Sequence, residues 1–282
     1  MKTERGPFKI IKALFKFLVS KELEEFPILK KIAFYYRWAS FQGNKMYVNP
    51  RDRVITPLIL KDGVWEAVES KLFKKVIRKG MTVLDLGANV GWYTLIAAKS
   101  AGKSGKVYAF EPDADNCALL RKNVQINGYK NVIVEQKAAL DHNGKIKLFL
   151  SRDNLGDHRT YDSHDGRKWA SAEGIVLDDY FDDNHKKIDV IKMDIQGAEM
   201  AALAGMEKII RANDKLKMLV EFSPSLIEKS GFSPEDFLNR IVQFGFKIRV
   251  IGIQRKIGVN EMMGLFNGKP LDHGLNFFLE RN

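Results

Sequence analysis

Residues 81–98, MTVLDLGANVGWYTLIAA, decide the fold. A short apolar run ends around Asp85 and passes through Gly87 and Gly91 before residues 92–98 resume with a helical pattern. Glycine admits backbone conformations that are closed to other residues, so the two glycines permit a tight turn between a buried strand and a helix. This order of strand, glycine turn and helix is typical of nucleotide-binding α/β domains.

The spacing of the glycines separates two classes of cofactor. A nicotinamide or flavin fingerprint has glycines at the first, third and sixth positions, where this chain has Gly87, Asn89 and Trp92. The corresponding turn for S-adenosylmethionine (SAM) has an acid two residues before the first of three alternating glycines, and it matches Asp85, Gly87 and Gly91. Asn89 replaces the middle glycine, and asparagine tolerates a positive φ well. The spacing favours SAM. From this turn alone, the strand-to-helix turn of another kind of doubly wound protein remains an alternative interpretation.

Length and composition limit the organisation of the chain. With 282 residues, it can form one large α/β domain with additions, or at most two small domains. An apolar content of 45% is sufficient for a hydrophobic core. Cys117 is the single cysteine, so no internal disulfide can form, which fits a reduced, cytoplasmic environment.

The positive charge is concentrated near the N-terminus. The net charge is +11, and residues 1–45 carry ten Lys or Arg against four Glu. Within them, residues 8–19 (FKIIKALFKFLV) have the spacing of a basic amphipathic helix. Such a helix docks on its own domain or on a second subunit, or it lies on an anionic membrane surface. The sequence leaves both interpretations open.

Secretion and membrane spanning are not expected. The lysines of residues 8–19 interrupt any apolar core of a signal peptide, and no uninterrupted apolar run approaches the roughly 18 residues of a membrane span. We therefore expect a cytoplasmic protein, and a peripheral contact with the inner face of a membrane through residues 8–19 stays open.

Strands and helices alternate after residue 81, which predicts parallel strand pairing and a doubly wound sheet. The further predicted strands cover residues 106–110, 132–134, 188–193, 217–222, 246–251 and 275–279. The predicted helices cover residues 92–98, 113–125, a segment that begins near Ala198, and 233–244.

Other segments are less regular. Residues 46–55 predict a short hairpin around an Asn-Pro pair, followed by a helix over residues 65–77. An extra strand is predicted over residues 145–150. Residues 151–172 have no periodicity and are too long for an ordinary connection, so we expect a lid or binding loop, followed by an extended segment over residues 175–181.

SAM carries a sulfonium, an α-amino acid tail, a ribose diol and an adenine, so its pocket needs different groups at different strand ends. We expect Asp85 near the ammonium group and the backbone of Gly87, Asn89 and Gly91 against the amino-acid and ribose parts. Glu111, at the end of the second strand, is expected to accept hydrogen bonds from both ribose hydroxyls.

Two later strand ends complete the predicted site. Ala138 and Ala139 are small enough for a flat adenine to lie against them. Asp194 follows a strand whose carboxyl end opens on the same crevice as the first. Lys192 lies within the apolar run before Asp194, and a buried lysine needs an acidic partner such as this one.

Four motifs together resemble a known family. VLDLGANVGWYT, FEPDADNCALLRKNV, VIKMDIQGAE and LVEFSP are similar to successive motifs of FkbM-type SAM-dependent methyltransferases, over about residues 47–224. The stretches NLGDH (154–158) and LDDY (177–180) extend this similarity. Gln196 stands where many members of that family carry an acid.

The resemblance implies a Rossmann-like class I methyltransferase fold in the α/β class, with a mostly parallel seven-stranded sheet whose last strand is antiparallel. It also implies O-methylation of a hydroxyl on a sugar, glycan, lipid-linked glycan or secondary metabolite. We expect a methyltransferase domain over residues 46–282 and a basic amphipathic helical extension over residues 1–45, to which nothing carries over from the family.

A hydroxyl acceptor requires a general base in line with the methyl donor. The candidates are Asp194 and Glu221, at the ends of adjacent strands, and His158 in the long loop, whose ordinary pKa suits the task. A structural pairing of Glu221 with Lys192 stays open. The Asp and His residues of the long loop lack metal-ligand spacing, so we predict no metal requirement.

Two other functions remain open. Nucleic acid is disfavoured as a partner, because amino-directed nucleic-acid methyltransferases carry an Asn/Asp-Pro-Pro-aromatic stretch where this chain has Asp194-Ile195-Gln196-Gly197. An RNA 2′-O-methyltransferase is harder to exclude, since Lys192, Asp194 and Glu221 resemble a lysine and acid set. A non-catalytic SAM-binding interaction protein is the remaining alternative, and the oligomeric state is not indicated.

Overall fold

The computed structural model describes residues 38–181, 187–253 and 274–281. Residues 8–19, for which the sequence predicts an amphipathic helix, lie outside the described residues, as does most of the predicted extension over residues 1–45. None of the described helices combines the length and the apolar character that a bilayer crossing requires.

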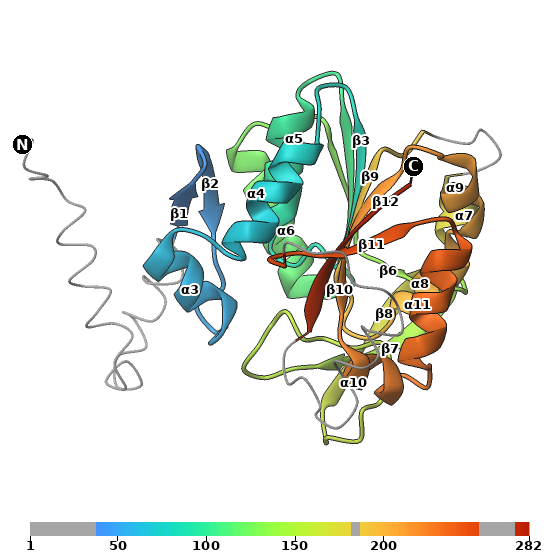
Figure 1. Cartoon of the computed structure of the whole chain (residues 1–282). Helices are drawn as coiled ribbons and strands as arrows, with labels where there is room; N and C mark the ends of the chain where they lie inside the picture. Colours follow the sequence, from blue (N-terminus) through green and yellow to red (C-terminus); the bar gives the residue numbers. More distant parts are fainter. Residues whose placement is uncertain (1–37, 182–186, 254–273, 282) are drawn as a thin grey trace, which may run out of the picture.

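A seven-stranded sheet forms the centre of the molecule, in the order β11-β12-β10-β9-β3-β4-β5 (Figure 1). Its strands are β3 (Thr82–Leu86), β4 (Lys106–Phe110), β5 (Val132–Glu135), β9 (Val190–Met193), β10 (Lys217–Phe222), β11 (Lys247–Val250) and β12 (Leu275–Glu280). The neighbours from β10 to β5 pair in parallel, whereas β12 is antiparallel to both β10 and β11. The predicted class I methyltransferase architecture with an antiparallel last strand is confirmed.

The sheet is covered by different helices on its two faces (Figure 1). Val83 of β3 lies in the core on one face with Phe73 and Leu95, whereas the next residue, Leu84, lies in the opposite core with Leu203. The first face carries α4 (Ala67–Val76), α5 (Trp92–Ala101) and α6 (Ala114–Ile126), and the second carries α7 (Leu177–Tyr180), α8 (Glu199–Gly205), α9 (Glu207–Ala212) and α11 (Pro234–Gln243). Because both faces are covered, a polar site can form only at the strand ends.

The predicted hairpin across residues 46–55 is wrong, because the hairpin lies one segment earlier. Strands β1 (Trp38–Phe41) and β2 (Asn44–Tyr47) pair across a turn in which Gln42 and Gly43 have positive φ.

Residues 55–62 form helix α3 (Ile55–Asp62) instead of a returning strand. Asp52 accepts a hydrogen bond from the Thr56 amide, and the Thr56 hydroxyl donates to the Asn49 carbonyl at 2.9 Å, so the first helical turn is closed by side chains. Ile59 is buried on the inner face of this helix. These side-chain hydrogen bonds and the burial of Ile59 outweigh the strand propensity of the Val54-Ile55 pair.

The hairpin is held against α6 by two asparagine side chains. Asn123 accepts a hydrogen bond from the Tyr47 amide at 2.7 Å and donates to the Tyr47 carbonyl at 2.9 Å. Asn127 repeats this pattern one turn later, with Lys45 at 2.8 and 2.6 Å. The side chains of α6 thus act as an additional partner for β2.

A second, three-stranded sheet has the order β6-β8-β7, with β6 (Ala138–Ala139), β7 (Gly144–Leu150) and β8 (Lys168–Ile175). The strand predicted over residues 145–150 is confirmed. The aperiodic segment predicted to reach residue 172 ends earlier, because β8 begins at Lys168, and the predicted extended segment over 175–181 contains the short helix α7. Most of β8 is exposed, so its sequence lacks alternation, and its pairing with β7 is what makes it a strand.

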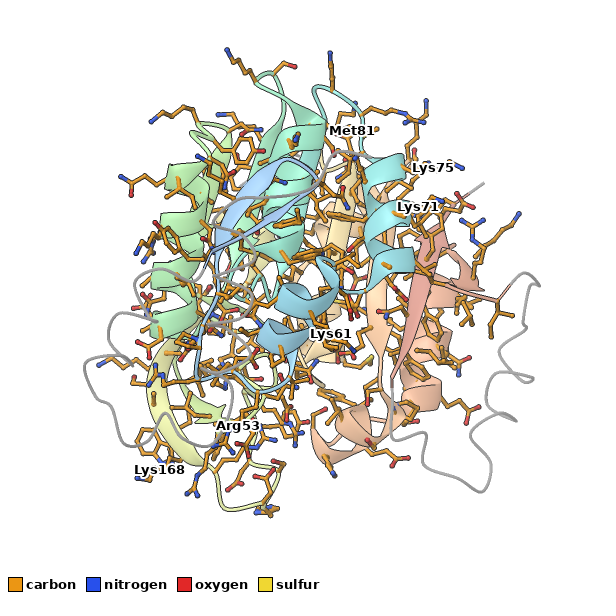
Figure 2. All side chains as sticks on the ribbon, turned by 90° about the vertical axis from the view of Figure 1, so that its left-hand side faces the viewer. Arg53, Lys61, Lys71, Lys75, Met81 and Lys168 are labelled. Carbon is orange, nitrogen blue, oxygen red and sulfur yellow. The ribbon has the colours of Figure 1, made fainter. Side chains whose placement is uncertain are left out.

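The outer face of α3 and α4 carries basic side chains (Figure 2). Lys61 of α3 and Lys71 and Lys75 of α4 are exposed there. The inner side of the α3–α4 segment faces away from these lysines and forms one wall of the site.

α10 (Pro224–Lys229) follows β10 at the carboxyl edge of the sheet.

Candidate functional site

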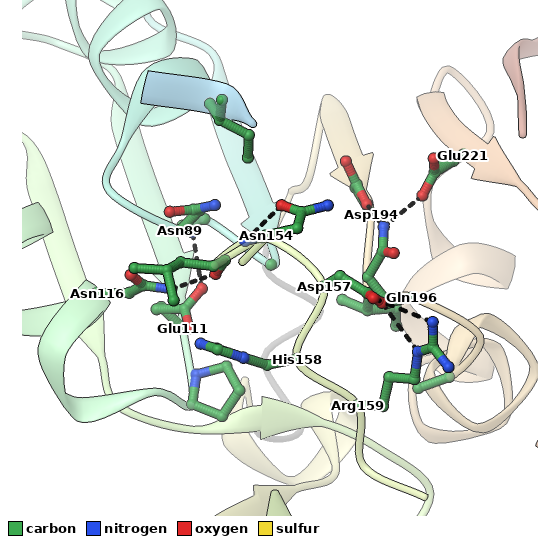
Figure 3. A pocket seen from close by; sticks show the side chains of 18 of the residues that line it. Asn89, Glu111, Asn116, Asn154, Asp157, His158, Arg159, Asp194, Gln196 and Glu221 are labelled. Carbon is green, nitrogen blue, oxygen red and sulfur yellow. Dashed lines mark hydrogen bonds and ion pairs between the residues drawn. The ribbon is translucent and has the colours of Figure 1, made fainter. Parts of the chain in front are cut away.

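A cavity of about 710 Å³ opens at the carboxyl ends of β3, β4, β9 and β10. This volume lies within the roughly 300–1,000 Å³ of small-molecule sites. Among the predicted site residues, the cavity is lined by Gly87, Asn89, Glu111, Ala138, His158, Asp194 and Glu221. Figure 3 shows Asn89, Glu111 and His158 on one side of it and Asp194 and Glu221 on the other.

Glu111 is positioned by backbone donors at the end of β4. Its Oε2 accepts from the Asn89 amide at 2.7 Å, and its Oε1 accepts from the Asp113 amide at 2.9 Å. Burial raises the pKa of Glu111 to about 8, and the two amides oppose this shift without cancelling it. Each oxygen keeps a lone pair for a donor in the cavity, which is the arrangement that a vicinal diol requires.

The glycine turn brings the ends of β3 and β9 close together. A Cβ added to Gly87, where φ is +78°, would lie 1.9 Å from the Asp194 carbonyl oxygen. Asn89 takes a positive φ of 49°, as its place in the motif predicts. Gly91 does not line the cavity, and a Cβ there would lie 2.6 Å from Leu120, so this glycine permits the packing of α5 against α6.

Asp85 does not occupy the position that we expected. Its side chain lies on the α5 side of the sheet, 1% exposed, and accepts a hydrogen bond from the Thr94 hydroxyl at 2.5 Å. The side chain points toward that helix because Asp85 is still inside β3, where alternate residues face opposite sides. Burial raises the pKa of Asp85 to about 6. The Asp85 side chain therefore lies beneath the cavity and does not contact a ligand ammonium group directly.

Asp194 and Glu221 form a bridged pair on the other side of the cavity. The Gln196 amide nitrogen donates to Asp194 Oδ1 at 2.7 Å and to Glu221 Oε2 at 2.6 Å (Figure 3). Burial and the neighbouring Asp194 raise the pKa of Glu221 well above its ordinary value. Of the two carboxyl groups, Glu221 is thus the more readily protonated.

Lys192 supplies the positive charge beneath this pair. Its side chain is 2% exposed, and Nζ lies 3.4 Å from Asp194 Oδ2, as predicted from its place in an apolar strand. Burial opposes ionisation of Asp194, but Lys192 and the hydrogen bonds outweigh it and hold the pKa of Asp194 below its ordinary value. Burial disfavours the charged lysine too, yet the surrounding carboxylates raise its pKa.

Glu66, from the segment between α3 and α4, was not predicted as a site residue. It lines the cavity, and its Oε2 accepts from the Tyr93 hydroxyl at 2.5 Å while its Oε1 accepts from the Asn276 amide nitrogen at 3.3 Å. Asn276 also lines the cavity, and its place within the apolar run Leu275–Glu280 is a signal that sequence analysis can use. Glu66 has no comparable signal.

The long loop covers the Glu111 side of the cavity. The Ser151 amide donates to His158 Nδ1 at 3.0 Å, and burial lowers the pKa of His158. Asp157 accepts from Arg159 Nε at 2.9 Å and forms an ion pair with Arg167 at 2.6 Å, which ties the loop to itself. The structure thus separates His158 from the Asp194–Glu221 pair (Figure 3).

The residues present fit SAM. Glu111 and Asn116 offer acceptor oxygens, and Asn116 Oδ1 is buried without a hydrogen-bond partner among the described residues. Ala138 and Leu148 provide buried apolar surface for a base. The carboxyl groups at the opposite end suit a ligand that carries sulfonium and ammonium charges. Among the described residues, no cluster of His, Cys, Asp or Glu is arranged to hold a metal ion.

Comparisons with known proteins agree with this geometry. The methyltransferase FkbM domain model matches residues 85–248. Protein-L-isoaspartate O-methyltransferase of Methanococcoides burtonii is 40% identical over 58 residues, which are 21% of this chain and 29% of that protein. The probable cobalt-precorrin-6B C(15)-methyltransferase of Sulfurisphaera tokodaii is 36% identical over 74 residues, 25% of this chain and 38% of that protein. The chain spans well under half the length of these relatives.

Among solved structures, a SAM-dependent methyltransferase from Aquifex aeolicus aligns with a TM-score of 0.43 and 16% identity, over 79% of this chain and 92% of that one.

Proposed function

Since the chain belongs to the FkbM methyltransferase family and its cofactor is SAM, we propose that it methylates a hydroxyl group. The acceptor class that we propose is a sugar, glycan, lipid-linked glycan or secondary metabolite. The observation that carries the proposal is the Asp194–Gln196–Glu221 arrangement, which presents an ionised carboxylate to the cavity.

Bound SAM supplies an electrophilic methyl group. Asp194 accepts the proton of the attacking hydroxyl, and Gln196 orients its carboxylate through Oδ1 at 2.7 Å. A carboxylate with a lowered pKa is a weak base, but the hydroxyl becomes strongly acidic as its oxygen gains the methyl group. Lys192, 3.4 Å from Oδ2, keeps Asp194 ionised before the acceptor binds.

Of the three candidate bases, the geometry favours Asp194. Burial and the neighbouring Asp194 raise the pKa of Glu221, which favours its protonated form and suits a hydrogen-bond donor that positions the acceptor or Asp194. His158 lies on the Glu111 side, where its neutral ring suits contacts to the bound nucleoside.

The RNA 2′-O-methyltransferase alternative loses support from the position of Lys192. A lysine that activates a ribose hydroxyl must reach the acceptor, whereas Lys192 lies beneath the cavity and is paired with Asp194. The non-catalytic alternative predicts SAM binding without transfer, so it is decided by the same assay.

The test is transfer of a labelled methyl group, screened over hydroxylated glycans, lipids, metabolites and RNA. We expect Asp194→Asn to lower the transfer rate at saturating SAM by about 10²–10⁴-fold, the range typical of a general base, and calorimetry separates this loss from any change in SAM affinity. Transfer to RNA with salt-sensitive binding supports the alternative. SAM binding by a wild-type protein that methylates none of these acceptors contradicts the proposal.

For residues 8–19, outside the described residues, we retain both interpretations as proposals: docking on the protein itself, or a peripheral contact with the inner face of a membrane in a cytoplasmic protein. Deletion of residues 1–20 tests them. Unchanged binding to anionic vesicles removes the membrane contact.

A further inference from the structure

We infer that Glu66 binds the α-ammonium group of the SAM amino-acid tail. The inference rests on the SAM assignment. It means that the segment before the matched family domain contributes a residue to the cofactor site. Glu66 lies outside residues 85–248, to which the family model corresponds. Its role follows from its position, its partners and the charges around it.

Glu66 lies on the side of the cavity where the amino-acid tail of SAM would lie. With the ribose held by Glu111 at the end of β4, the tail would extend across the ends of β3 and β9. Glu66 is held on that side, because its partners Tyr93 and Asn276 belong to α5 and β12.

The other carboxyl groups on this side are already engaged. Asp85 is bound to Thr94 and does not line the cavity. Asp194 is paired with Lys192 and bound to Gln196, which also donates to Glu221. Like Asp85 and Glu221, Glu66 makes no ion pair with any residue that the structure describes; unlike Asp85 it lines the cavity, where two neutral donors fix its carboxylate.

The charges at this end agree with a cationic ligand. Glu66, Asp194, Glu221 and the underlying Asp85 surround one ammonium group, that of Lys192, which each of these acids influences. Carboxyl groups are thus in excess over ammonium groups at this end, and burial raises the pKa of Glu66 itself, which disfavours its ionised form. An ammonium group beside Glu66 compensates this excess and replaces the solvation that burial removes.

The backbone at Glu66 is held in an uncommon conformation. Glu66 has a φ of 46°, and of the five described non-glycine residues with positive φ, three line the cavity: Glu66, Asn89 and Gln196. A left-handed conformation at such a residue costs about 1–2 kcal/mol and persists where surrounding contacts impose it. The strain places Glu66 at the start of α4 with its carboxylate facing the cavity.

The experiment compares ligands that differ in the amino-acid tail. Calorimetry measures binding of SAM, S-adenosylhomocysteine and 5′-methylthioadenosine, which lacks both the ammonium and the carboxylate of the tail. The variants are Glu66→Gln, which keeps the size and one acceptor oxygen for Asn276 while its amide nitrogen can donate to the Tyr93 hydroxyl oxygen, and Glu69→Gln. Glu69 is the matched control, since it lies one turn later, receives the same Asn276 amide at 3.4 Å, and does not line the cavity.

We expect Glu66→Gln to weaken binding of SAM and S-adenosylhomocysteine by about 10- to 100-fold, the effect of one hydrogen bond between charged groups. Binding of 5′-methylthioadenosine should change less than about threefold, and Glu69→Gln should leave all three ligands unchanged. Equal losses for all three ligands, or unchanged SAM binding with a raised KM for the acceptor, overturn the inference. Failure of the wild type to bind SAM instead overturns the cofactor assignment on which it rests.

Discussion

The Glu111 end of the cavity is assembled from neighbours along the chain, whereas the Glu66 end gathers residues from segments more than 200 positions apart. At the first end, backbone amides of the glycine turn and of the next loop fix one carboxylate. At the second, side chains of α4, α5, β9, β10 and β12 fix one another. Local motifs therefore determine where the nucleoside binds, and tertiary packing determines the charge around the reacting groups.

The largest expected effect is loss of the buried cation at the Glu66 end. Lys192→Met leaves Asp194 and its acidic neighbours without a counter-charge, and we expect it to lower the free energy of unfolding by about 3–5 kcal/mol. Urea denaturation measures the loss. The deficit should shrink as the pH falls toward 5, because protonated carboxyl groups need no counter-charge.

The control for this variant is Lys71→Met on the exposed face of α4 (Figure 2), with an expected change within about 0.5 kcal/mol. If Lys192→Met lowers the free energy of unfolding no more than Lys71→Met does, the Glu66 end does not depend on a buried cation, and the contrast between the two ends is wrong.

The second prediction concerns the joint between the ends. Gly87→Ala introduces a Cβ 1.9 Å from the Asp194 carbonyl oxygen, so β3 and β9 must separate, and we expect SAM affinity to fall at least about 100-fold. Gly63→Ala is the control, because Gly63 has a similar φ of +69° and nothing within 4 Å. It should cost roughly 1–2 kcal/mol of stability and leave SAM binding intact. Equal loss of binding in both variants means that backbone strain alone is responsible.

A smaller effect is expected at the Glu111 end. Above pH 8, where Glu111 is ionised, Glu111→Gln should weaken SAM binding by about 10- to 30-fold, because a neutral amide accepts hydroxyl donors less strongly than a carboxylate. The wild type should bind SAM more tightly as the pH rises toward and past 8, where Glu111 ionises. Calorimetry from pH 6 to 9 checks both effects.

Ionisation of Glu111 should have the opposite effect on stability: it strengthens SAM binding as the pH rises, but it lowers the free energy of unfolding. The folded pKa of about 8 lies above the ordinary 4.5, so the folded state binds more protons between these values, and the wild type loses stability as the pH rises through this window. In Glu111→Gln this contribution is absent. A variant that keeps the pH profile of the wild type shows that another group titrates.

The strand positions and the Glu111 end could be predicted because their signals are local. Most strands end in an acid or a glycine turn, and Asp113, the N-cap of α6, accepts from the Asn116 amide at 2.8 Å. The predictions for residues 46–55 and 168–181 were wrong where other contacts outweigh propensity: side-chain hydrogen bonds of Asp52 and Thr56 hold the start of α3, and pairing with β7 defines β8.

The Glu66 end escaped prediction for a related reason. Asp85 was identified as the ammonium-binding acid from its place in the motif, but strand alternation turns it toward α5. Glu66 stands before a helix in an unremarkable sequence, and only folding brings it beside Tyr93 and Asn276.

The hydrogen bonds of Asn123 and Asn127 connect the β1–β2 hairpin, through α6, to the nucleoside end of the cavity. Asp113, whose amide holds Glu111, is the N-cap of α6, and Asn123 in the last turn and Asn127 directly after it bind the backbone of β2. We expect a ligand that orders the start of α6 to slow the opening of the hairpin at its far end. Hydrogen exchange at the amides of Tyr47 and Lys45 would report on the nucleoside site without touching it.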